Sequence, residues 1–349
     1  MLTDDFLAWI AGVRRYSERT CEIYSDVLKE FMEFLSGYTA DGSSCIGNAP
    51  ATETLAKLLT VSVIRDYEYS LSEERKLSGR TVNQHLSVIS SFCRWLMGQG
   101  LLRTNPVKLV SRPRCSKRMP VFFRKESMEE YFNASAPAAD TESLQQLESA
   151  AGALHDGSPR SSSAWKFAAE LYDRRLRRMI VSMLFETGMR RAEMISLKIG
   201  SVDYGRSIIK VHGKGDKMRE IPMTSALSEE ISLYLKAAET IAGRERAAAE
   251  PLLITLGGAE LYPVFVDRAV KRELGQVDGI TGRKSPHVLR HTLATELLND
   301  GSDLYSIKEM LGHSSLAATQ VYTHNTIEKL KKVYTNAHPR AKRGGKNGD

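Results

Sequence analysis

Cysteine is scarce in this chain, with four among 349 residues. They stand far apart, at Cys21, Cys45, Cys93 and Cys115, and never form a C-x-x-C pair. This spacing argues against a disulfide framework and against a zinc site built on cysteine. We therefore expect reduced thiols in a cytoplasmic protein.

Long apolar runs are also missing. The first residues, Met-Leu-Thr-Asp-Asp, lack the basic and apolar regions of a signal peptide. The apolar run from Met179 to Phe185 is far too short to cross a bilayer. With 42% hydrophobic and 26% charged residues, the composition is that of an ordinary globular protein. We therefore expect no membrane partner.

The length and charge suggest the broad organisation. A chain of 349 residues is long enough for about two domains. The formal net charge of +7 is compatible with nucleic-acid binding, but by itself it is weak support. No internal repeat is evident.

The N-terminal third is predicted to be all helical. Apolar residues recur at helical spacing over 17–35, with Ser17 as the N-cap, and helices are also expected over 62–75 and 81–97. A Gly-, Ser- and Thr-rich loop is predicted from Tyr38 to Thr54. Residues 1–108 are therefore expected to form a small helical domain.

A basic stretch broken by prolines follows, and we take residues 109–120 as a linker. It carries Arg112, Arg114, Lys117 and Arg118. These charges either face solvent in a plain interdomain connection or also lie along a phosphate backbone, and the sequence supports both interpretations equally.

Residues 121–337 are predicted to form a second domain that mixes helices with a small sheet. Two β-type segments, 207–211 and 218–223, flank a glycine-bearing turn, and helices are expected on both sides of them. Residues 133–163 are poor in aromatics, so we expect an inserted and largely mobile loop with a short helix near 143–153. Residues 338–349 form a basic tail. The predicted fold class is mainly α with a small antiparallel sheet (α+β).

The first group with chemical potential is Thr187-Gly188-Met189-Arg190 with Glu193. Gly188 breaks one helix and a new one begins near Arg190. Because Arg190 and Glu193 are three residues apart, the carboxylate can hold the guanidinium in place. A surface ion pair is the simpler interpretation, but the apolar segments on both sides argue against full solvation.

The second group is the turn Gly213-Lys214-Gly215. Glycines on both sides of a lysine allow a tight turn that carries the ammonium group outward. Such a lysine can contact phosphate or protonate a leaving oxygen. An ordinary exposed lysine would give the same pattern.

The third group is Ser285-Pro286-His287-Val288-Leu289-Arg290-His291. Ser285 is predicted as an N-cap with proline at the first helical position. His287, Arg290 and His291 would then share a face near the positive end of the helix, where a phosphate binds. A zinc pair, His287 with His291, is disfavoured because no third ligand is evident.

The last group contains His313, in Leu311-Gly312-His313, and Tyr322 nine residues later. Alone, each is an ordinary turn histidine or core tyrosine. Together with two arginines and a lysine, they are the side chains needed to break a phosphodiester without a metal, because a phenol attacks only when cations and a proton acceptor assist it.

Taken together, these groups resemble the tyrosine recombinase (phage integrase) family, most closely its Xer-like bacterial branch. The matching segments include Thr187 to Glu193, Gly213 to Pro222, Ser285 to His291, Leu311 to His313 and Thr319 to His324. The segments Tyr16 to Thr20 and Leu77 to Asn83 resemble the family's helical core-binding (SAM-like) domain. Met189 stands where leucine is more common.

The resemblance implies a role for each residue. Arg190 and Arg290 would clamp the scissile phosphate, Lys214 would protonate the leaving 5′-oxygen, and Tyr322 would be the nucleophile. His287 and His313 would assist proton transfer, with Glu193 in support. The reaction would proceed through a covalent 3′-phosphotyrosine, with no cofactor and no metal.

The resemblance also implies partners. These are double-stranded DNA with a specific recombination site, further copies of the chain in a tetramer on two duplexes, and a second recombinase or a DNA translocase, within a nucleoid-associated setting. The two domains would close as a clamp on DNA, and residues 326–337 would pass to a neighbouring subunit. The candidate DNA-contacting residues are Arg80, Thr81, Gln84, Arg112, Arg114, Lys117 and Arg118.

Three biological roles fit: resolution of chromosome dimers, DNA inversion and integration of a mobile element. Two alternatives to recombination also stay open at this point. One is DNA relaxation of the type IB topoisomerase kind, which uses a similar set of residues. The other is a non-catalytic relative that only bridges DNA sites.

Overall fold

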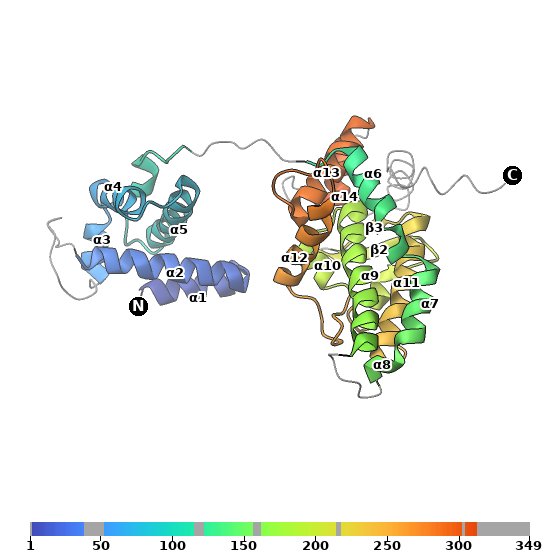
Figure 1. Ribbon diagram of the computed structural model, residues 1–349. Helices are drawn as coiled ribbons and strands as arrows, with labels where there is room; N and C mark the ends of the chain where they lie inside the picture. Colours follow the sequence, from blue (N-terminus) through green and yellow to red (C-terminus); the bar gives the residue numbers. More distant parts are fainter. Residues whose placement is uncertain are drawn as a thin grey trace. The chain divides into compact units, whose positions relative to one another are not determined.

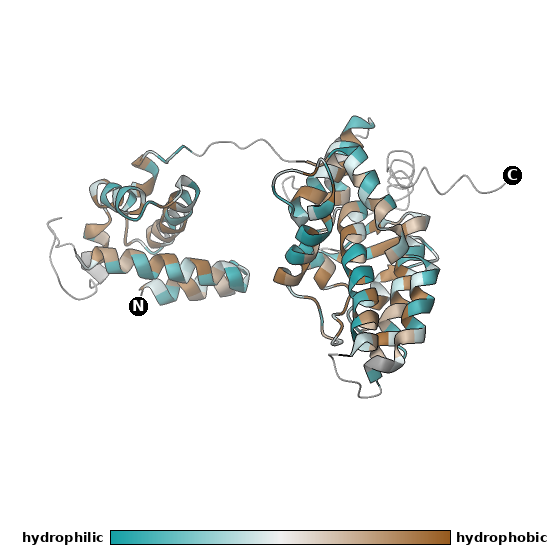
Figure 2. Cartoon of the chain, viewed as in Figure 1, coloured by the Kyte–Doolittle hydropathy of each residue, from teal (hydrophilic) through white to brown (hydrophobic). Residues whose placement is uncertain are grey.

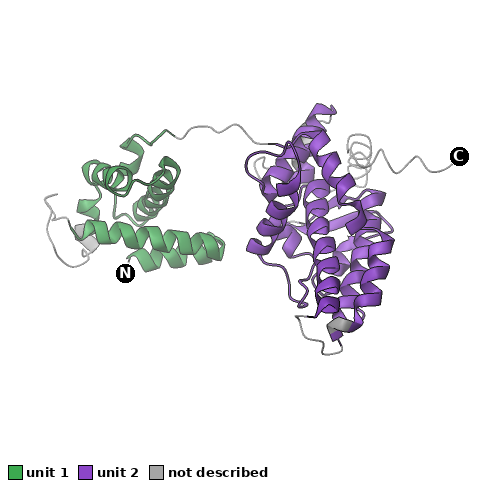
Figure 3. Ribbon diagram, in the orientation of Figure 1, with its two compact units in different colours: residues 1–118 green, residues 119–349 purple. Residues whose placement is uncertain are grey.

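The computed structural model describes residues 2–37, 52–114, 122–155, 162–213, 218–301 and 304–312. The chain divides into two compact units, Met1–Arg118 and Met119–Asp349 (Figure 3). The boundary between them falls inside the basic stretch 109–120.

Unit 1 is entirely helical in its described residues. Its elements are α1 (Leu2–Gly12), α2 (Glu18–Leu35), α3 (Thr52–Leu58), α4 (Val61–Tyr69), a π-helical segment (Ser70–Glu74), α5 (Gly79–Gly98) and a 3₁₀ turn (Pro106–Leu109). The three helices that we predicted here are confirmed, whereas α1 and α3 were not predicted. Residues 38–51 of the predicted loop lie outside the described residues, and its last three residues belong to α3 instead.

Side-chain caps explain where two of these helices begin. Ser17 Oγ accepts a hydrogen bond from the backbone N–H of Thr20 at 3.4 Å, which confirms the predicted N-cap of α2. Ser78 does the same for α5 through Thr81 at 3.2 Å. The apolar faces of these helices bury Phe31 and Phe92 completely.

Unit 2 combines helices with one small sheet. Its elements are α6 (Lys125–Ala134), α7 (Thr141–Ala150), α8 (Gly152–His155), α9 (Ser163–Thr187), α10 (Arg191–Ile195), β1 (Val202–Asp203), β2 (Ile208–His212), β3 (Met218–Pro222), α11 (Ser225–Ala242), α12 (Pro263–Glu273), α13 (Pro286–Asn299) and α14 (Leu304–Leu311), with short 3₁₀ turns at Ala136–Ala138, Ile199–Ser201 and Leu274–Gln276.

Helix α9 lies at the centre of unit 2 (Figure 1). Helices α7, α11, α12 and α13 all pack against it. Its second half is buried on every side, including Ile180, Leu184 and Phe185. In both units the helices carry hydrophobic stripes beside hydrophilic ones (Figure 2), as expected for helices that share a core.

The sheet has the order β1-β2-β3, and both pairs are antiparallel. The predicted β2–β3 hairpin is confirmed, with Val211 opposite Arg219. Strand β1 is only two residues long and was not predicted. The unit is thus mainly helical with a small antiparallel sheet, so the predicted fold class is confirmed.

The described part of residues 133–163 is mostly helical rather than a loop, and α7 confirms the short helix that was expected near 143–153. Helix α7 begins at an Asp140 side-chain cap and buries Leu144 and Leu147 against its neighbours. Arg175 of α9 fixes the preceding turn by donating to the carbonyl oxygen of Asp140. Two leucines in an Ala- and Ser-rich segment are therefore enough to dock this helix against α9 and α11.

None of the helices in the described ranges has the length and apolar character needed to span a bilayer.

Candidate active site

The turn from α9 into α10 brings Arg190 close to α13 and α14. Gly188 ends α9 in the left-handed region, with φ +59°. A Cβ on this glycine would lie 2.5 Å from Leu311 Cδ2 and 2.9 Å from Leu293 Cδ2. Glycine is therefore required here for its backbone conformation and for the close approach of two other helices.

Glu193 holds Arg190 in two ways, as the three-residue spacing predicted. Its Oε2 accepts from the Arg190 backbone N–H at 2.7 Å, and its Oε1 accepts from Arg190 Nη1 at 2.7 Å. The Arg190 side chain stays 35% exposed while that of Glu193 is only 6% exposed. The buried Glu193 thus fixes the Arg190 guanidinium, which remains accessible from solvent.

A second arginine, Arg219 of β3, also binds Glu193. Its Nη1 and Nη2 donate to Oε1 and Oε2 at 2.8 Å each, and the Arg219 side chain is 6% exposed. Burial is the largest effect on Glu193 and favours protonation, but hydrogen bonds from Arg219 and Arg190 outweigh it and lower the pKa to about 2. Glu193 is therefore a carboxylate at neutral pH.

We did not predict a role for Arg219, although the sequence carries a signal for it. Arg219 and Ile221 are two residues apart in a strand, so they share a face, and Ile221 is fully buried. An arginine on the inward face of a strand needs a buried partner.

Arg290 is buried at 8% exposure on α13. Its Nη1 donates to the Gly188 carbonyl oxygen and its Nη2 to the Leu311 carbonyl oxygen, both at 2.6 Å. Burial, followed by the charges of Arg190 and Arg219, lowers its pKa to about 10, which leaves it protonated at neutral pH. Several positive guanidinium groups therefore surround the single carboxylate of Glu193, an arrangement that favours an anion.

His287 lies in the first turn of α13 and is exposed. Partial burial, and then the positive charges of Arg191 and Arg290, lower its pKa. The imidazole is therefore neutral at physiological pH and able to accept a proton.

One detail of the α13 prediction needs correction. Ser285 occupies the N-cap position, but its side chain makes no capping hydrogen bond, while Pro286 is at the start of the helix as predicted. His287, Arg290 and His291 lie in the first two turns of α13, where Arg290 is buried and both histidines are exposed.

Lys214, His313 and Tyr322 lie outside the described residues. The described neighbours of His313 in sequence are nevertheless part of the cluster. Arg190 Nη2 donates to the Gly312 carbonyl oxygen at 2.7 Å, immediately before His313.

In unit 1, the candidate DNA-contacting residues begin α5. Arg80 and Gln84 are exposed, and Thr81 is half-buried. The hydroxyl of Thr81 lies 2.9 Å from that of Ser78, so this side chain helps to start the helix.

The beginning of the basic stretch lies against the same helix. Arg112 Nη1 donates to Ser87 Oγ at 2.9 Å, and Asn83 Nδ2 donates to the Pro113 carbonyl oxygen at 2.9 Å. Arg112 and Arg114 are both exposed. Lys117 and Arg118 lie outside the described residues.

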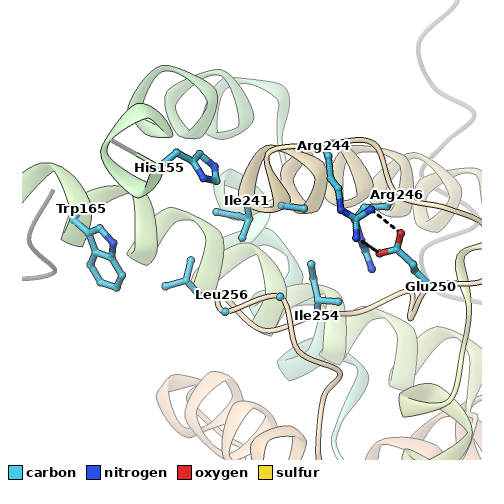
Figure 4. Close-up of a pocket in the computed structure, with 11 residues that line it drawn as sticks. His155, Trp165, Ile241, Arg244, Arg246, Glu250, Ile254 and Leu256 are labelled. Atoms are coloured by element: carbon cyan, nitrogen blue, oxygen red, sulfur yellow. Dashed lines mark hydrogen bonds and ion pairs between the residues drawn. The ribbon is translucent and has the colours of Figure 1, made fainter. Parts of the chain in front are cut away.

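A pocket elsewhere in unit 2 is separate from this cluster. Side chains of α8, α9, α11 and the segment after α11 line it, including His155, Trp165 and Ile254 (Figure 4). Two charged residues at its rim form an ion pair, in which Arg244 Nη1 and Nη2 donate to Glu250 at 2.8 and 3.0 Å. Among the described residues, no group of three or more His, Cys, Asp or Glu side chains is arranged to hold a metal ion.

Comparison with known proteins identifies the family to which this chain belongs. The phage integrase family matches residues 165–329, and the phage integrase N-terminal SAM-like domain matches residues 2–101. The chain therefore belongs to the phage integrase family of tyrosine recombinases, enzymes that cleave and rejoin DNA in site-specific recombination, and the resemblance seen in the sequence is confirmed.

Among its relatives is the tyrosine recombinase XerC of Chlorobaculum tepidum, which is 30% identical over 340 residues, covering 97% of this chain and 94% of the relative. Similar folds include XerH bound to its difH substrate in a pre-cleavage complex (TM-score 0.57, 18% identity, 92% of this chain and 81% of the other). A lambda integrase dimer bound to a COC′ core site is also similar (TM-score 0.55, 16% identity, 100% and 78%).

Proposed function

We propose that Arg190, Lys214, His287, Arg290, His313 and Tyr322 form one catalytic site that cleaves and rejoins DNA through a 3′-phosphotyrosine. The observation that carries this proposal is the cluster around Glu193. It brings together Arg190 of the α9–α10 turn and Arg290 of α13 at the end of α14, directly before His313 in sequence.

In the proposed reaction, the Tyr322 oxygen attacks phosphorus while its proton passes to a histidine. A bond forms between phosphorus and the tyrosine oxygen, the bond to the 5′-oxygen breaks, and Lys214 gives that oxygen a proton. Rejoining reverses each step with a new 5′-hydroxyl. Because the phosphodiester energy is kept in the covalent intermediate, no nucleotide is consumed.

The arginines would serve as the electrostatic clamp. A guanidinium presents its donors as a planar fork that suits two phosphate oxygens, and it stays charged at any working pH. Arg190 is held by Glu193 and by the Gly312 carbonyl oxygen, so little reorganisation is needed when a phosphate arrives. His287, neutral and exposed, would accept or relay the proton.

The partner in this proposal is double-stranded DNA with a specific site. Two solved structures with this fold are complexes with DNA, one of them a dimer, which supports DNA binding and self-association on DNA. The finer form is a tetramer on two duplexes, with a second recombinase or a DNA translocase as further partner. The XerC relative favours a Xer-type role in a bacterial cytoplasm, near the nucleoid.

Unit 1 would supply sequence-dependent contacts through α5. Arg80, Gln84 and Ser87 follow one another at helical spacing along this helix, and Arg112 extends the row by its bond to Ser87. The two arginines at the ends of this row suit phosphate contacts, and the Gln84 amide between them suits a base contact.

The arginine clamp can be tested by substitution. Arg190→Lys and Arg290→Lys keep the charge but lose the fork, so we expect each to slow cleavage of a nicked duplex carrying the recombination site by on the order of 10²–10³-fold. Single-turnover formation of the protein–DNA adduct measures this. Arg244→Lys, at the separate ion pair with Glu250, is the matched control and should cleave at the parental rate. Parental rates in both clamp variants would refute the assignment.

A further inference from the structure

We propose that Arg219 is a positioning residue for strand cleavage, acting by fixing Glu193 and the end of α14 and thereby Arg190. This inference rests on the proposed function. Arg219 lies on β3, 26 residues after Glu193, and it donates to Glu193 and to the Met310 carbonyl oxygen, both on buried residues.

The first part of the argument is the shared carboxylate. Glu193 Oε1 accepts both from Arg190 Nη1, at 2.7 Å, and from Arg219 Nη1, at 2.8 Å. Arg219 engages both carboxylate oxygens, so it fixes the rotation of the carboxyl group as well as its position. Arg219 therefore affects the orientation of Arg190 indirectly, through Glu193.

The second part is the end of α14, where three successive carbonyl oxygens accept from three different arginines. Met310 accepts from Arg219 Nε at 3.1 Å, Leu311 from Arg290 at 2.6 Å and Gly312 from Arg190 at 2.7 Å. The last carbonyls of a helix have no partner within the helix, and cations there also favour its dipole. The two proposed phosphate clamps and Arg219 thus act together on the residues that precede His313.

The Gly312 backbone also lies close to the Arg219 guanidinium. Gly312 has φ +67°, and a Cβ on it would lie 3.2 Å from Arg219 Nη1. The Arg219 guanidinium therefore lies directly against the turn that leads to His313. Displacing it would change both the end of α14 and the support of Arg190.

A purely structural salt bridge is the competing explanation, because buried ion pairs often contribute little to stability and can be replaced. The same sheet provides a matched comparison. Arg206, in the turn before β2, donates through both terminal nitrogens to Glu220 of β3 at 2.9 Å, and this pair is far more exposed, at 42% and 23%, than the pair of Arg219 and Glu193.

The test compares Arg219→Gln, Arg219→Lys and the control Arg206→Gln in the full chain. Duplex affinity, thermal midpoint and single-turnover cleavage of the nicked duplex are measured from about pH 5.5 to about pH 8.5. We expect Arg219→Gln to cleave about 100-fold more slowly at neutral pH, because Arg190 is displaced, while duplex affinity changes little. Arg219→Lys should lose less, and Arg206→Gln should match the parent.

The pH profile separates positioning from general weakening. Glu193 faces Arg190, Arg219 and the nearby charge of Arg290, and losing Arg219 removes its strongest hydrogen bonds and raises its pKa. The Arg219→Gln defect should therefore deepen as pH falls and ease as pH rises. If Arg219→Gln does not fold, Arg219→Lys must show the same trend at smaller amplitude.

Tyr322→Phe in the same assay separates the two claims. An adduct that survives Tyr322→Phe would overturn the proposed nucleophile, and with it a role of Arg219 in that site. Loss of the adduct in Tyr322→Phe, with parental rate and pH profile in Arg219→Gln, would overturn the Arg219 inference alone. A rate loss independent of pH, matched by an equal loss of duplex affinity, would also refute positioning.

Discussion

At the scale of single residues, Gly188 shows how closely the site is packed. The left-handed backbone and the two leucines that face the missing Cβ leave no room for a side chain. The carbonyl oxygen of this glycine also accepts a hydrogen bond from Arg290. The absence of a side chain at Gly188 therefore allows α9, α13 and α14 to pack closely together.

We expect Gly188→Ala to lower the free energy of unfolding by roughly 2–4 kcal/mol, from left-handed strain and overpacking together. Urea denaturation measures the change. Gly98→Ala is the control, because a Cβ there meets nothing within 4 Å. A loss in the control equal to that of Gly188→Ala would contradict the packing explanation.

Local spacing predicted some residue contacts but not the long-range ones. The bond between Arg190 and Glu193 follows from a separation of three residues at a helix start. The bond between Arg219 and Glu193 spans 26 residues and depends on how β3 packs beside α10, which no local pattern specifies. The burial of Arg290 likewise comes from the packing of α13.

At the scale of elements, α13 carries an unusual group beyond the site. Glu296 is only 9% exposed, and neither of its carboxylate oxygens has a hydrogen-bond partner among the described residues. Burial raises its pKa to about 7, Lys125 opposes the change, and the acidic groups of Asp300, Glu129 and Glu126 add to it.

This raised pKa predicts a dependence of stability on pH. Because the folded-state pKa lies above the ordinary 4.5, the folded state binds the proton more tightly, and stability falls as pH rises from about 4.5 toward 7. Glu296→Gln should therefore stabilise the protein by roughly 3 kcal/mol at about pH 8 and change little at about pH 4.

Urea denaturation at the two pH values measures the effect, with Glu229→Gln on the exposed side of α11 as the control. An equal change in Glu296→Gln at both pH values would contradict a buried, ionisable carboxylate.

Elements with a strong periodic pattern were predictable, and those formed by tertiary packing were not. Helices α2, α5 and α11 have apolar faces and begin at side-chain N-caps. A short helix was expected near α7, but its segment offers only Leu144 and Leu147 among small residues, so most of residues 133–163 resembled a loop. Strand β1 exists only because Val202 pairs with Ile209 of β2.

At the scale of the whole molecule, the chain combines a helical unit with a mixed unit that carries the arginine cluster. Family membership and the enzyme class follow from the joint pattern of motifs, since each motif alone has an ordinary structural explanation. The sequence of the DNA site does not follow from these motifs, because base contacts depend on individual side chains, for which we propose Gln84, and on the bases they meet.

The most direct test of the central claim is covalent capture. The full chain is incubated with a nicked duplex carrying the recombination site, in the presence of EDTA, and the protein–DNA adduct is separated under denaturing conditions. We predict an adduct at the 3′-phosphate that forms without divalent metal and is lost in Tyr322→Phe. An adduct that persists in Tyr322→Phe, or one that forms only with Mg²⁺, would contradict it.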